Sequence, residues 1–124
     1  MNIVYINCSV FPFVDLIIAN KKVYETRNRN TLKSLIGQEI YLAETGKGKA
    51  TVKAKCTITD LVTVTDKATY NRYRKETQVA KGSVFDFCSS TKAKYLYRLD
   101  NVQPVEPFPV PDNTVKHGRV YATV

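Results

Sequence analysis

The sequence predicts an α+β fold, a mostly antiparallel β-barrel with two main flanking helices. The first observation behind this prediction is a series of roughly five to seven segments in which apolar and polar residues alternate, as in half-buried strands. The second is a pair of segments, residues 10–19 and 66–79, with apolar residues at helical spacing. Because the chain shows no internal repeat and no low-complexity linker, residues 1–124 are predicted to form a single domain.

The N-terminal part of the chain is predicted to form a strand, a helix and a second strand. Residues 1–9 alternate as a strand, and residues 10–19 follow as a helix that tolerates Pro12 in its first turn. Asn20 stands where a left-handed residue often ends a helix. The chain is therefore expected to enter a strand over residues 22–27 through a tight turn.

The middle of the chain predicts a hairpin and a long strand. A helical turn is expected over residues 31–36, and residues 39–43 alternate as a strand. The Gly-Lys-Gly-Lys segment at 46–49 lacks the spacing of a phosphate-binding Walker loop, so a hairpin turn is the simpler interpretation. Residues 51–65 are rich in threonine and valine and predict one bent strand, or two strands joined by a bulge.

The C-terminal half predicts one helix and two strands. Asp66 is the expected N-cap of a mostly polar surface helix over residues 66–79. Residues 92–99 form a strong strand pattern, and a final short strand is expected over residues 119–123. Four prolines between residues 104 and 111 argue against regular pairing and predict an extended strap over the surface.

Composition points to a cytoplasmic protein with anionic partners. Lysine and arginine total 19 against 11 acidic residues, a formal charge of +8 that favours polyanions. No apolar stretch reaches the roughly 18 residues of a membrane span, and the N-terminus lacks the features of a signal peptide. Cys8, Cys56 and Cys88 are expected to be buried free thiols, and a single histidine, His117, cannot build a multi-histidine metal site. Neither a metal nor a cofactor is expected.

The most informative part of the sequence is the segment from Asn20 to Arg27, which contains Lys22, Glu25 and Arg27 directly after the first predicted helix. Alternate residues of a strand share a face, so Glu25 and Arg27 are expected to pair, with Lys22 reaching in from the start of the strand. Burying such charges is unfavourable unless they are hydrogen-bonded. The set is therefore expected either to lie in water or to line a cleft.

This segment resembles the signature of the ASCH domain within the PUA-like superfamily, in which a glycine is followed by lysine, glutamate and arginine at fixed spacing. Asn20 stands at the position of the glycine, and asparagine tolerates the left-handed conformation best among the other residues. A Leu-Ile-Gly turn at residues 35–37, a late strand over residues 95–102 and the proline-rich segment after it extend the resemblance to residues 4–110. The resemblance implies a β-barrel whose cleft receives the lysine, the carboxylate and the arginine.

For binding, the resemblance implies an RNA or nucleotide ligand in this cleft. The phosphates are then expected to contact the cations Lys21, Lys22, Arg27 and Arg29. The side-chain amides of Asn28 and Asn30 would hydrogen-bond base edges, and the ring of Tyr24 or of a loop tyrosine would stack on a base. Glu25 would orient Arg27 or accept a hydrogen bond from an exocyclic amine.

A catalytic alternative is open because some small bacterial members of the family are amidohydrolases that remove the acetyl group from N4-acetylcytidine, and others are ribonucleases. Lys22 would then act as a base or proton shuttle, Glu25 would position it or the attacking water, and Glu76 would be the later carboxylate. The threonine nucleophile proposed for the amidohydrolases is replaced here by Glu25, so that route does not carry over. A third alternative is a protein-interaction adaptor that uses residues 104–111.

Overall fold

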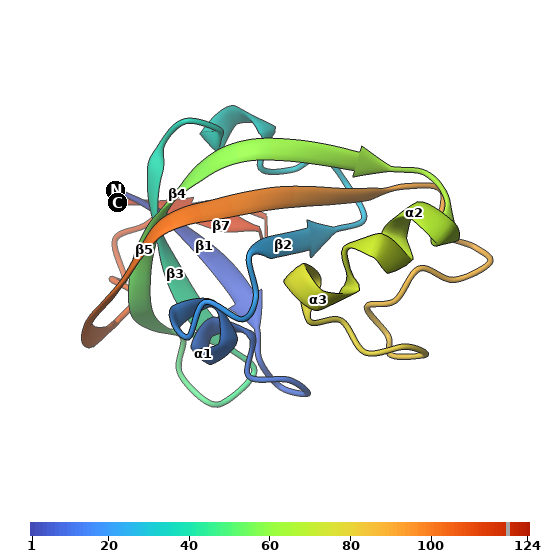
Figure 1. Cartoon of the computed structure of the whole chain (residues 1–124). Helices are drawn as coiled ribbons and strands as arrows, with labels where there is room; N and C mark the ends of the chain where they lie inside the picture. Colours follow the sequence, from blue (N-terminus) through green and yellow to red (C-terminus); the bar gives the residue numbers. More distant parts are fainter. Residues whose placement is uncertain (119) are drawn as a thin grey trace.

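The chain is described by a computed structural model over residues 1–118 and 120–124, in which one seven-stranded sheet is accompanied by three short α-helices (Figure 1). The strands are β1 (Asn2–Asn7), β2 (Tyr24–Arg27), β3 (Glu39–Thr45), β4 (Thr51–Val64), β5 (Lys94–Pro109), β6 (Val115–His117) and β7 (Tyr121–Thr123). The helices are α1 (Phe13–Ile18), α2 (Lys67–Arg72) and α3 (Arg74–Thr77), with a 3-10 turn over Lys33–Leu35. The α+β class is thereby confirmed.

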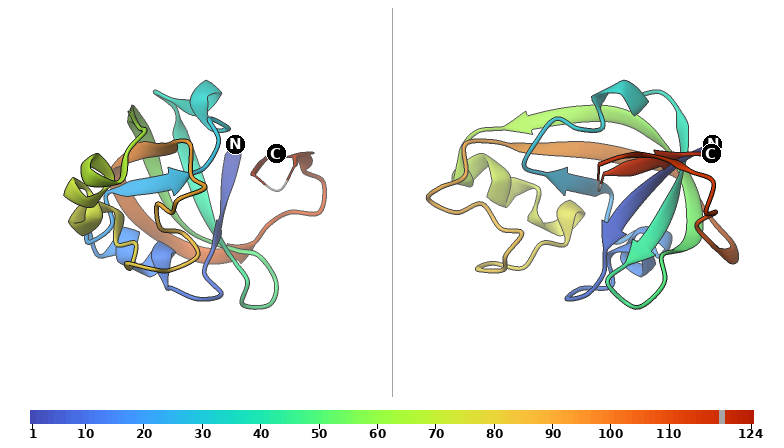
Figure 2. Two further views of the ribbon diagram at one scale, coloured as in Figure 1. Left: turned by 90° about the vertical axis from the view of Figure 1, so that its right-hand side faces the viewer. Right: turned by 180° about the vertical axis from the view of Figure 1, so that it is seen from behind.

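The sheet curls strongly but is not closed into a barrel, so the prediction of a barrel was wrong in this respect (Figure 2). Its order is β2-β5-β4-β3-β1-β7-β6, with β1 and β3 parallel and the other neighbours antiparallel. A strand has two edges, and in β1 one edge pairs with β3 while Asn2 to Val4 on the other edge pair with β7. The β7 strand thus occupies the edge that β2 would need for closure.

The curl follows from irregular pairing along the two longest strands. The register between β4 and β5 shifts at three places, between Val52 and Ala54, between Lys55 and Thr57, and between Ile58 and Asp60. Each β-bulge increases the local twist and bends the strand. The predicted bent strand over residues 51–65 is therefore confirmed as the single strand β4, and the turn before it forms the expected hairpin with β3.

The proline-rich segment is a strand rather than a strap, which corrects another prediction. In the register of β4 and β5, Ala54 is opposite Pro104 and Val52 is opposite Phe108. The β2 strand covers β5 only from Tyr95 to Arg98, so β5 is an edge strand beyond that point. Proline is tolerated on an edge strand because the missing N–H group need not serve a second neighbour.

The helices are shorter than the sequence predicted. The α1 helix begins at Phe13 because Pro12 occupies its N-cap position. Asp66 caps α2 as expected, accepting a hydrogen bond from the Thr69 amide at 2.8 Å. The predicted helix over 66–79 is broken at Tyr73, which ends α2 and precedes α3. This break accompanies the edge-to-face packing of the Tyr73 ring on Tyr24, with ring centroids 5.5 Å apart.

The turn between α1 and β2 positions the charged motif. Asn20 has φ 59°, as predicted, and the amides of Lys21 and Lys22 both donate to the carbonyl of Leu16 at the end of the helix. Lys22 therefore belongs to the turn, and β2 begins only at Tyr24. The side chain of Lys22 consequently does not follow the alternation of the strand.

Two apolar clusters flank β2 and β5. The larger one packs α1 against the inner face of the sheet and includes Val14, Ile17 and Tyr97. The second cluster joins Tyr70 of α2 to Tyr24 and Leu96 of the sheet. Because neighbouring residues of a strand point to opposite faces, β2 sends Tyr24 to the second cluster and Glu25 toward the first. The final strand was predicted from residue 119, which lies outside the described residues, and β7 begins at Tyr121.

Candidate functional site

The candidate site lies in the gap between β1 and β2. Pairing of β7 with β1 ends at Val4, so the edge of β1 beyond it faces β2, the edge strand at the far end of the sheet. The guanidinium of Arg27 crosses this gap and donates a hydrogen bond of 2.7 Å to the main-chain oxygen of Tyr5. One side chain therefore bridges the two strands where no sheet hydrogen bonds join them.

A pocket of about 530 Å³ opens at this gap, and we call it the β1–β2 pocket. Its volume falls within the range of roughly 300 to 1,000 Å³ that is usual for small-molecule sites. The pocket is lined by Tyr5, Ile6, Asn7, Ser9, Phe13, Glu25, Thr26, Arg27, Asn28, Thr45, Gly46, Val84, Phe85 and Lys94. It thus combines two strand edges, three aromatic residues, two cations and one carboxylate.

Glu25 lies at the wall of the pocket with both carboxylate oxygens occupied. Its Oε2 accepts from Nε and Nη2 of Arg27 at 3.1 and 3.0 Å, and its Oε1 accepts from the Thr26 amide at 3.2 Å. Nζ of Lys22 lies 3.9 Å from the same Oε1. A carboxylate with these contacts holds the Arg27 guanidinium in position.

Lys22 lies behind Glu25 and does not line the pocket. Only 1% of its side chain is exposed, and its Nζ donates to the Thr77 carbonyl at 2.6 Å and lies 4.5 Å from the centre of the Phe13 ring. Burial lowers the pKa of Lys22 to about 8, although the charge of Glu25 acts in the opposite direction. Lys22 is thus a buried cation at the base of the motif, separated from the ligand space.

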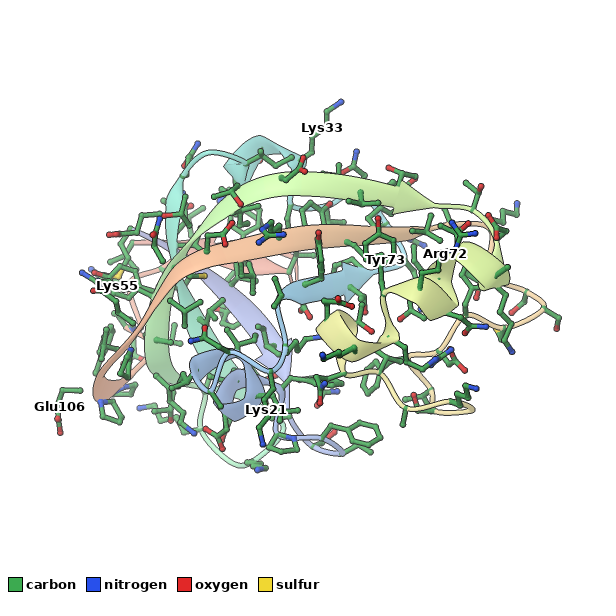
Figure 3. The ribbon with its side chains drawn as sticks, viewed as in Figure 1. Lys21, Lys33, Lys55, Arg72, Tyr73 and Glu106 are labelled. Carbon is green, nitrogen blue, oxygen red and sulfur yellow. The ribbon has the colours of Figure 1, made fainter. Side chains whose placement is uncertain are left out.

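The structure places most of the other predicted site residues apart from this pocket. Lys21 is exposed beside α1 (Figure 3), Tyr24 is buried in the second cluster, and Arg29 lines a neighbouring hollow. The main-chain oxygen of Glu76 accepts from the Val23 amide at 2.7 Å, whereas its buried Oε2 has no hydrogen-bond partner within the described residues. Asn28 lines the pocket, but the Asn30 side chain accepts from the Tyr97 hydroxyl at 2.8 Å.

The sequence prediction missed most of the lining residues, and two of them, Phe85 and Lys94, bear directly on the chemistry of the pocket. Phe85 lies in a loop without periodicity, so no pattern pointed to it. Its half-buried ring packs edge-to-face on Phe13 with centroids 5.4 Å apart and touches Phe11 at 6.2 Å. Lys94 did carry a signal, because it shares the strand face of Leu96, which is fully buried. A lysine at a core-facing position is unusual enough to mark a site.

The loop that carries Phe85 is held by a buried carboxylate. Asp86 Oδ1 accepts from the Phe87 amide at 2.8 Å and from Nη2 of Arg74 at 3.1 Å, and Oδ2 accepts from the Gly82 amide at 2.8 Å. Arg74 also donates to the carbonyl of Val79 at 2.9 Å. These contacts therefore join Arg74, the first residue of α3, to the loop that carries Phe85 beside the pocket.

Three further observations bear on the residues outside the pocket. Cys8 and Cys56 are buried free thiols as predicted, whereas Cys88 is exposed.

Within residues 1–118 and 120–124, no helix has the length and apolar character needed to cross a lipid bilayer. Basic residues such as Lys21, Lys33 and Arg72 lie on different sides of the molecule (Figure 3), so positive charge is not confined to the pocket.

Comparison with solved structures shows the fold. Crystal structures of the ASCH protein from Zymomonas mobilis include a serine-to-alanine mutant, with TM-score 0.72, 21% identity, and coverage of 87% of this chain and 72% of that protein. A tyrosine-to-phenylalanine mutant of the same protein gives TM-score 0.72 and 21% identity, and the match covers 88% of this chain and 75% of that protein. A third structure gives TM-score 0.70 and 18% identity, and the match covers 88% of this chain and 73% of that protein.

No protein-family model matches the sequence, and no curated protein matches it significantly. The resemblance that the motif predicted is nevertheless confirmed at the level of the fold by these structures. The chain therefore has an ASCH-like fold.

Proposed function

We propose that the protein binds single-stranded RNA, with one nucleotide unit seated in the β1–β2 pocket. The observation that carries this proposal is the combination of a half-buried aromatic ring, Phe85, and a guanidinium, Arg27, in the lining of one pocket. An aromatic face stacks on any base, and a cation attracts the phosphate. The ASCH-like fold and the formal charge of +8 support the same ligand class.

The strand edges favour a nucleobase over a purely apolar ligand. Beyond Val4, β1 has no β7 partner on the side of the pocket, and β2 is an edge strand. The lining also contains the side-chain amides of Asn7 and Asn28. Main-chain groups and side-chain amides at a pocket wall offer both hydrogen-bond donors and hydrogen-bond acceptors. The edge of a nucleobase also carries both kinds of group, so it can pair with such a wall.

The test is binding of a labelled mixed-sequence single-stranded RNA at several salt concentrations. Affinity should fall steeply with salt, and Phe85→Leu should weaken binding by about five- to tenfold, because base stacking contributes roughly 1 to 3 kcal/mol. Phe11→Leu is the matched control, since Phe11 belongs to the same aromatic cluster but does not line the pocket. An affinity for RNA that does not change with salt concentration would contradict the proposal. Equal loss of affinity in Phe85→Leu and Phe11→Leu would also contradict it.

Hydrolysis of N4-acylated cytidine, or of RNA, is the second candidate. One observation favours it: Lys22, with its pKa lowered to about 8, lies 3.9 Å from a carboxylate that lines the pocket. A lysine of this kind can transfer protons near neutral pH. Against it, Lys22 does not line the pocket and both oxygens of Glu25 are engaged.

Catalysis is tested by incubating the protein with N4-acetylcytidine, related acylated nucleosides and RNA. An enzyme should release cytidine or cleaved RNA, Lys22→Met should abolish this turnover, and Lys21→Met should not, because Lys21 is exposed outside the pocket. Absence of turnover across the panel would leave binding as the function.

A further inference from the structure

Lys94 lies where two hollows of the surface meet. The β1–β2 pocket shares Asn28, Val84 and Lys94 with a second hollow of about 400 Å³. The second hollow, which we call the Arg29 hollow, is lined by Asn28, Arg29, Val84, Asp86, Cys88, Ser90, Thr91, Lys92, Ala93 and Lys94. The two hollows therefore adjoin each other at Asn28, Val84 and Lys94.

Lys94 is buried without a counterion. Only 4% of the residue is exposed, and within residues 1–118 and 120–124 its ammonium has neither a hydrogen-bond partner nor a carboxylate within 4.0 Å. Burial lowers the pKa of Lys94, while Cys88 and Asp86 act in the opposite direction. The Lys94 ammonium is not one of the fully enclosed polar atoms, so it reaches solvent where the two hollows meet, and an anion bound there can form a charge-assisted hydrogen bond with it.

The nearby carboxylates are already used elsewhere. Among the described lining residues, Glu25 is the sole carboxylate of the β1–β2 pocket, and Asp86 is that of the Arg29 hollow. Glu25 is bound by Arg27, and Asp86 is bound by Arg74. Neither carboxylate forms an ion pair with Lys94, so the Lys94 ammonium is available to an anion at the junction.

We propose that Lys94 binds the phosphate that links two successive nucleotides of a single strand, one in the β1–β2 pocket and the next in the Arg29 hollow. This assignment rests on the proposed RNA-binding function and narrows its ligand to a dinucleotide unit. The exposed side chains of Arg29 and Lys92 continue the positive charge beyond the junction, as a second phosphate requires. A mononucleotide would leave this second hollow empty.

The experiment measures affinities for the four nucleosides, the nucleoside 3′- and 5′-monophosphates, and the corresponding dinucleoside monophosphates. The wild-type protein should bind a dinucleoside monophosphate at least about tenfold more tightly than the nucleoside, as expected for one charge-assisted hydrogen bond. Lys94→Met should remove this difference, because it should weaken binding of the dinucleoside monophosphate far more than binding of the nucleoside. Lys33→Met, which removes an exposed charge outside both the β1–β2 pocket and the Arg29 hollow, should keep the difference.

Two further readouts separate a specific role from a general loss of charge or of folding. With single-stranded RNA, Lys94→Met should reduce the slope of log affinity against log salt by about 0.7, the value for one phosphate contact. Its melting temperature should be equal to or higher than that of the wild type, because methionine removes a buried charge.

The outcomes distinguish the two proposals. Equal affinity of the wild type for nucleosides and dinucleoside monophosphates would overturn the role of Lys94 and leave RNA binding in place. Equal loss of affinity for nucleosides and for dinucleoside monophosphates in Lys94→Met would also overturn the role of Lys94 and leave RNA binding in place. No binding of any nucleoside, nucleotide or RNA would overturn both proposals, and selective binding of an acidic peptide of matched charge would replace them with a protein ligand.

Discussion

The guanidinium of Arg27 donates a 2.7 Å hydrogen bond to the main-chain oxygen of Tyr5, and this contact joins β2 to β1 where the sheet stays open. The same guanidinium pairs with Glu25 at 3.0 Å. One side chain thus bridges the gap and supplies a cation to the β1–β2 pocket. The gap that interrupts the sheet is therefore the feature that creates the site.

Replacing Arg27 by lysine should destabilise the fold despite conserving the charge. A lysine cannot hold the planar fork that reaches Glu25 and Tyr5 together, so one of the two groups is left without its donor. We expect a loss of about 1 to 2 kcal/mol in the free energy of unfolding, measured by urea denaturation. Arg98→Lys is the control, because the Arg98–Asp100 pair is exposed and such pairs contribute roughly 0 to 1 kcal/mol. Equal effects of the two substitutions would show that the contact with Tyr5 contributes nothing.

The lowered pKa of Lys22 predicts a pH dependence of stability. Burial holds the folded-state pKa at about 8, against 10.5 for the free side chain. Between these values the unfolded chain binds more protons at Lys22 than the folded chain, so stability from this residue rises with pH. The free energy of unfolding of the wild type, minus that of Lys22→Met, should increase by an amount on the order of 3 kcal/mol over this range.

This difference is measured by urea denaturation at a series of pH values from about 7 to 10.5. Subtracting the variant cancels the titration of tyrosines, cysteines and other lysines. Lys21→Met is the matched control, because it removes the neighbouring lysine, which is exposed. A flat profile for Lys22→Met would mean that the folded chain does not perturb this lysine.

The sequence predicted the α+β class and the pairing of Glu25 with Arg27 because both depend on local periodicity. It could not predict closure, since the open edge results from the three-residue strand β7 taking one edge of β1. The strap over residues 104–111 was wrong for a related reason. Proline excludes a central strand but not an edge strand, and whether β5 is an edge depends on the length of β2.

For the site, the sequence located the motif but not the ligand space. Alternation placed Lys22 on the face of Tyr24, whereas the turn after α1 directs it behind Glu25. The pocket walls come from β1, from the loop at Phe85 and from Lys94, which are far apart in sequence. Their meeting depends on long-range pairing, which short-range patterns do not encode.

Gly46 should be the least replaceable glycine of the hairpin between β3 and β4. Both Gly46 and Gly48 have left-handed φ, of 85° and 86°. A Cβ atom at Gly46 would lie 2.7 Å from Oδ1 of Asn7 and 2.9 Å from the amide nitrogen of Ser9, whereas one at Gly48 would meet nothing within 4 Å. Asn7 and Ser9 line the pocket, so the contact joins the hairpin to the site.

Gly48→Ala should therefore lower the free energy of unfolding by about 1 kcal/mol, the effect of the left-handed backbone alone. Gly46→Ala should lower it by about 1 to 3 kcal/mol more, because the added methyl group overlaps its neighbours. Urea denaturation of both variants measures the difference. Equal losses would show that the loop after β1 moves aside freely.

Asp86→Asn should loosen the loop that carries Phe85. The substitution keeps the size of the side chain but removes the charge that binds Arg74 and replaces one acceptor with an amide donor facing a main-chain N–H. We expect a loss of about 2 to 4 kcal/mol in the free energy of unfolding, because the partly buried guanidinium of Arg74 loses the carboxylate that neutralises it. Faster hydrogen exchange at the amides of Gly82 and Phe87 should accompany it. Asp112→Asn, at an exposed position, is the control.

The same contacts predict how this difference depends on pH. Burial acts to raise the pKa of Asp86, but hydrogen bonds from the Gly82 and Phe87 amides and from Arg74 outweigh it and hold the pKa below its usual value. A carboxyl whose pKa is depressed by folding stabilises the protein above its unfolded-state pKa of about 3.9, and this stabilisation is lost as pH falls through the folded-state value. The stability advantage of the wild type over Asp86→Asn should therefore shrink in acid. An advantage that stays constant down to the lowest pH at which the wild type remains folded would show that the charge of Asp86 does not hold the loop.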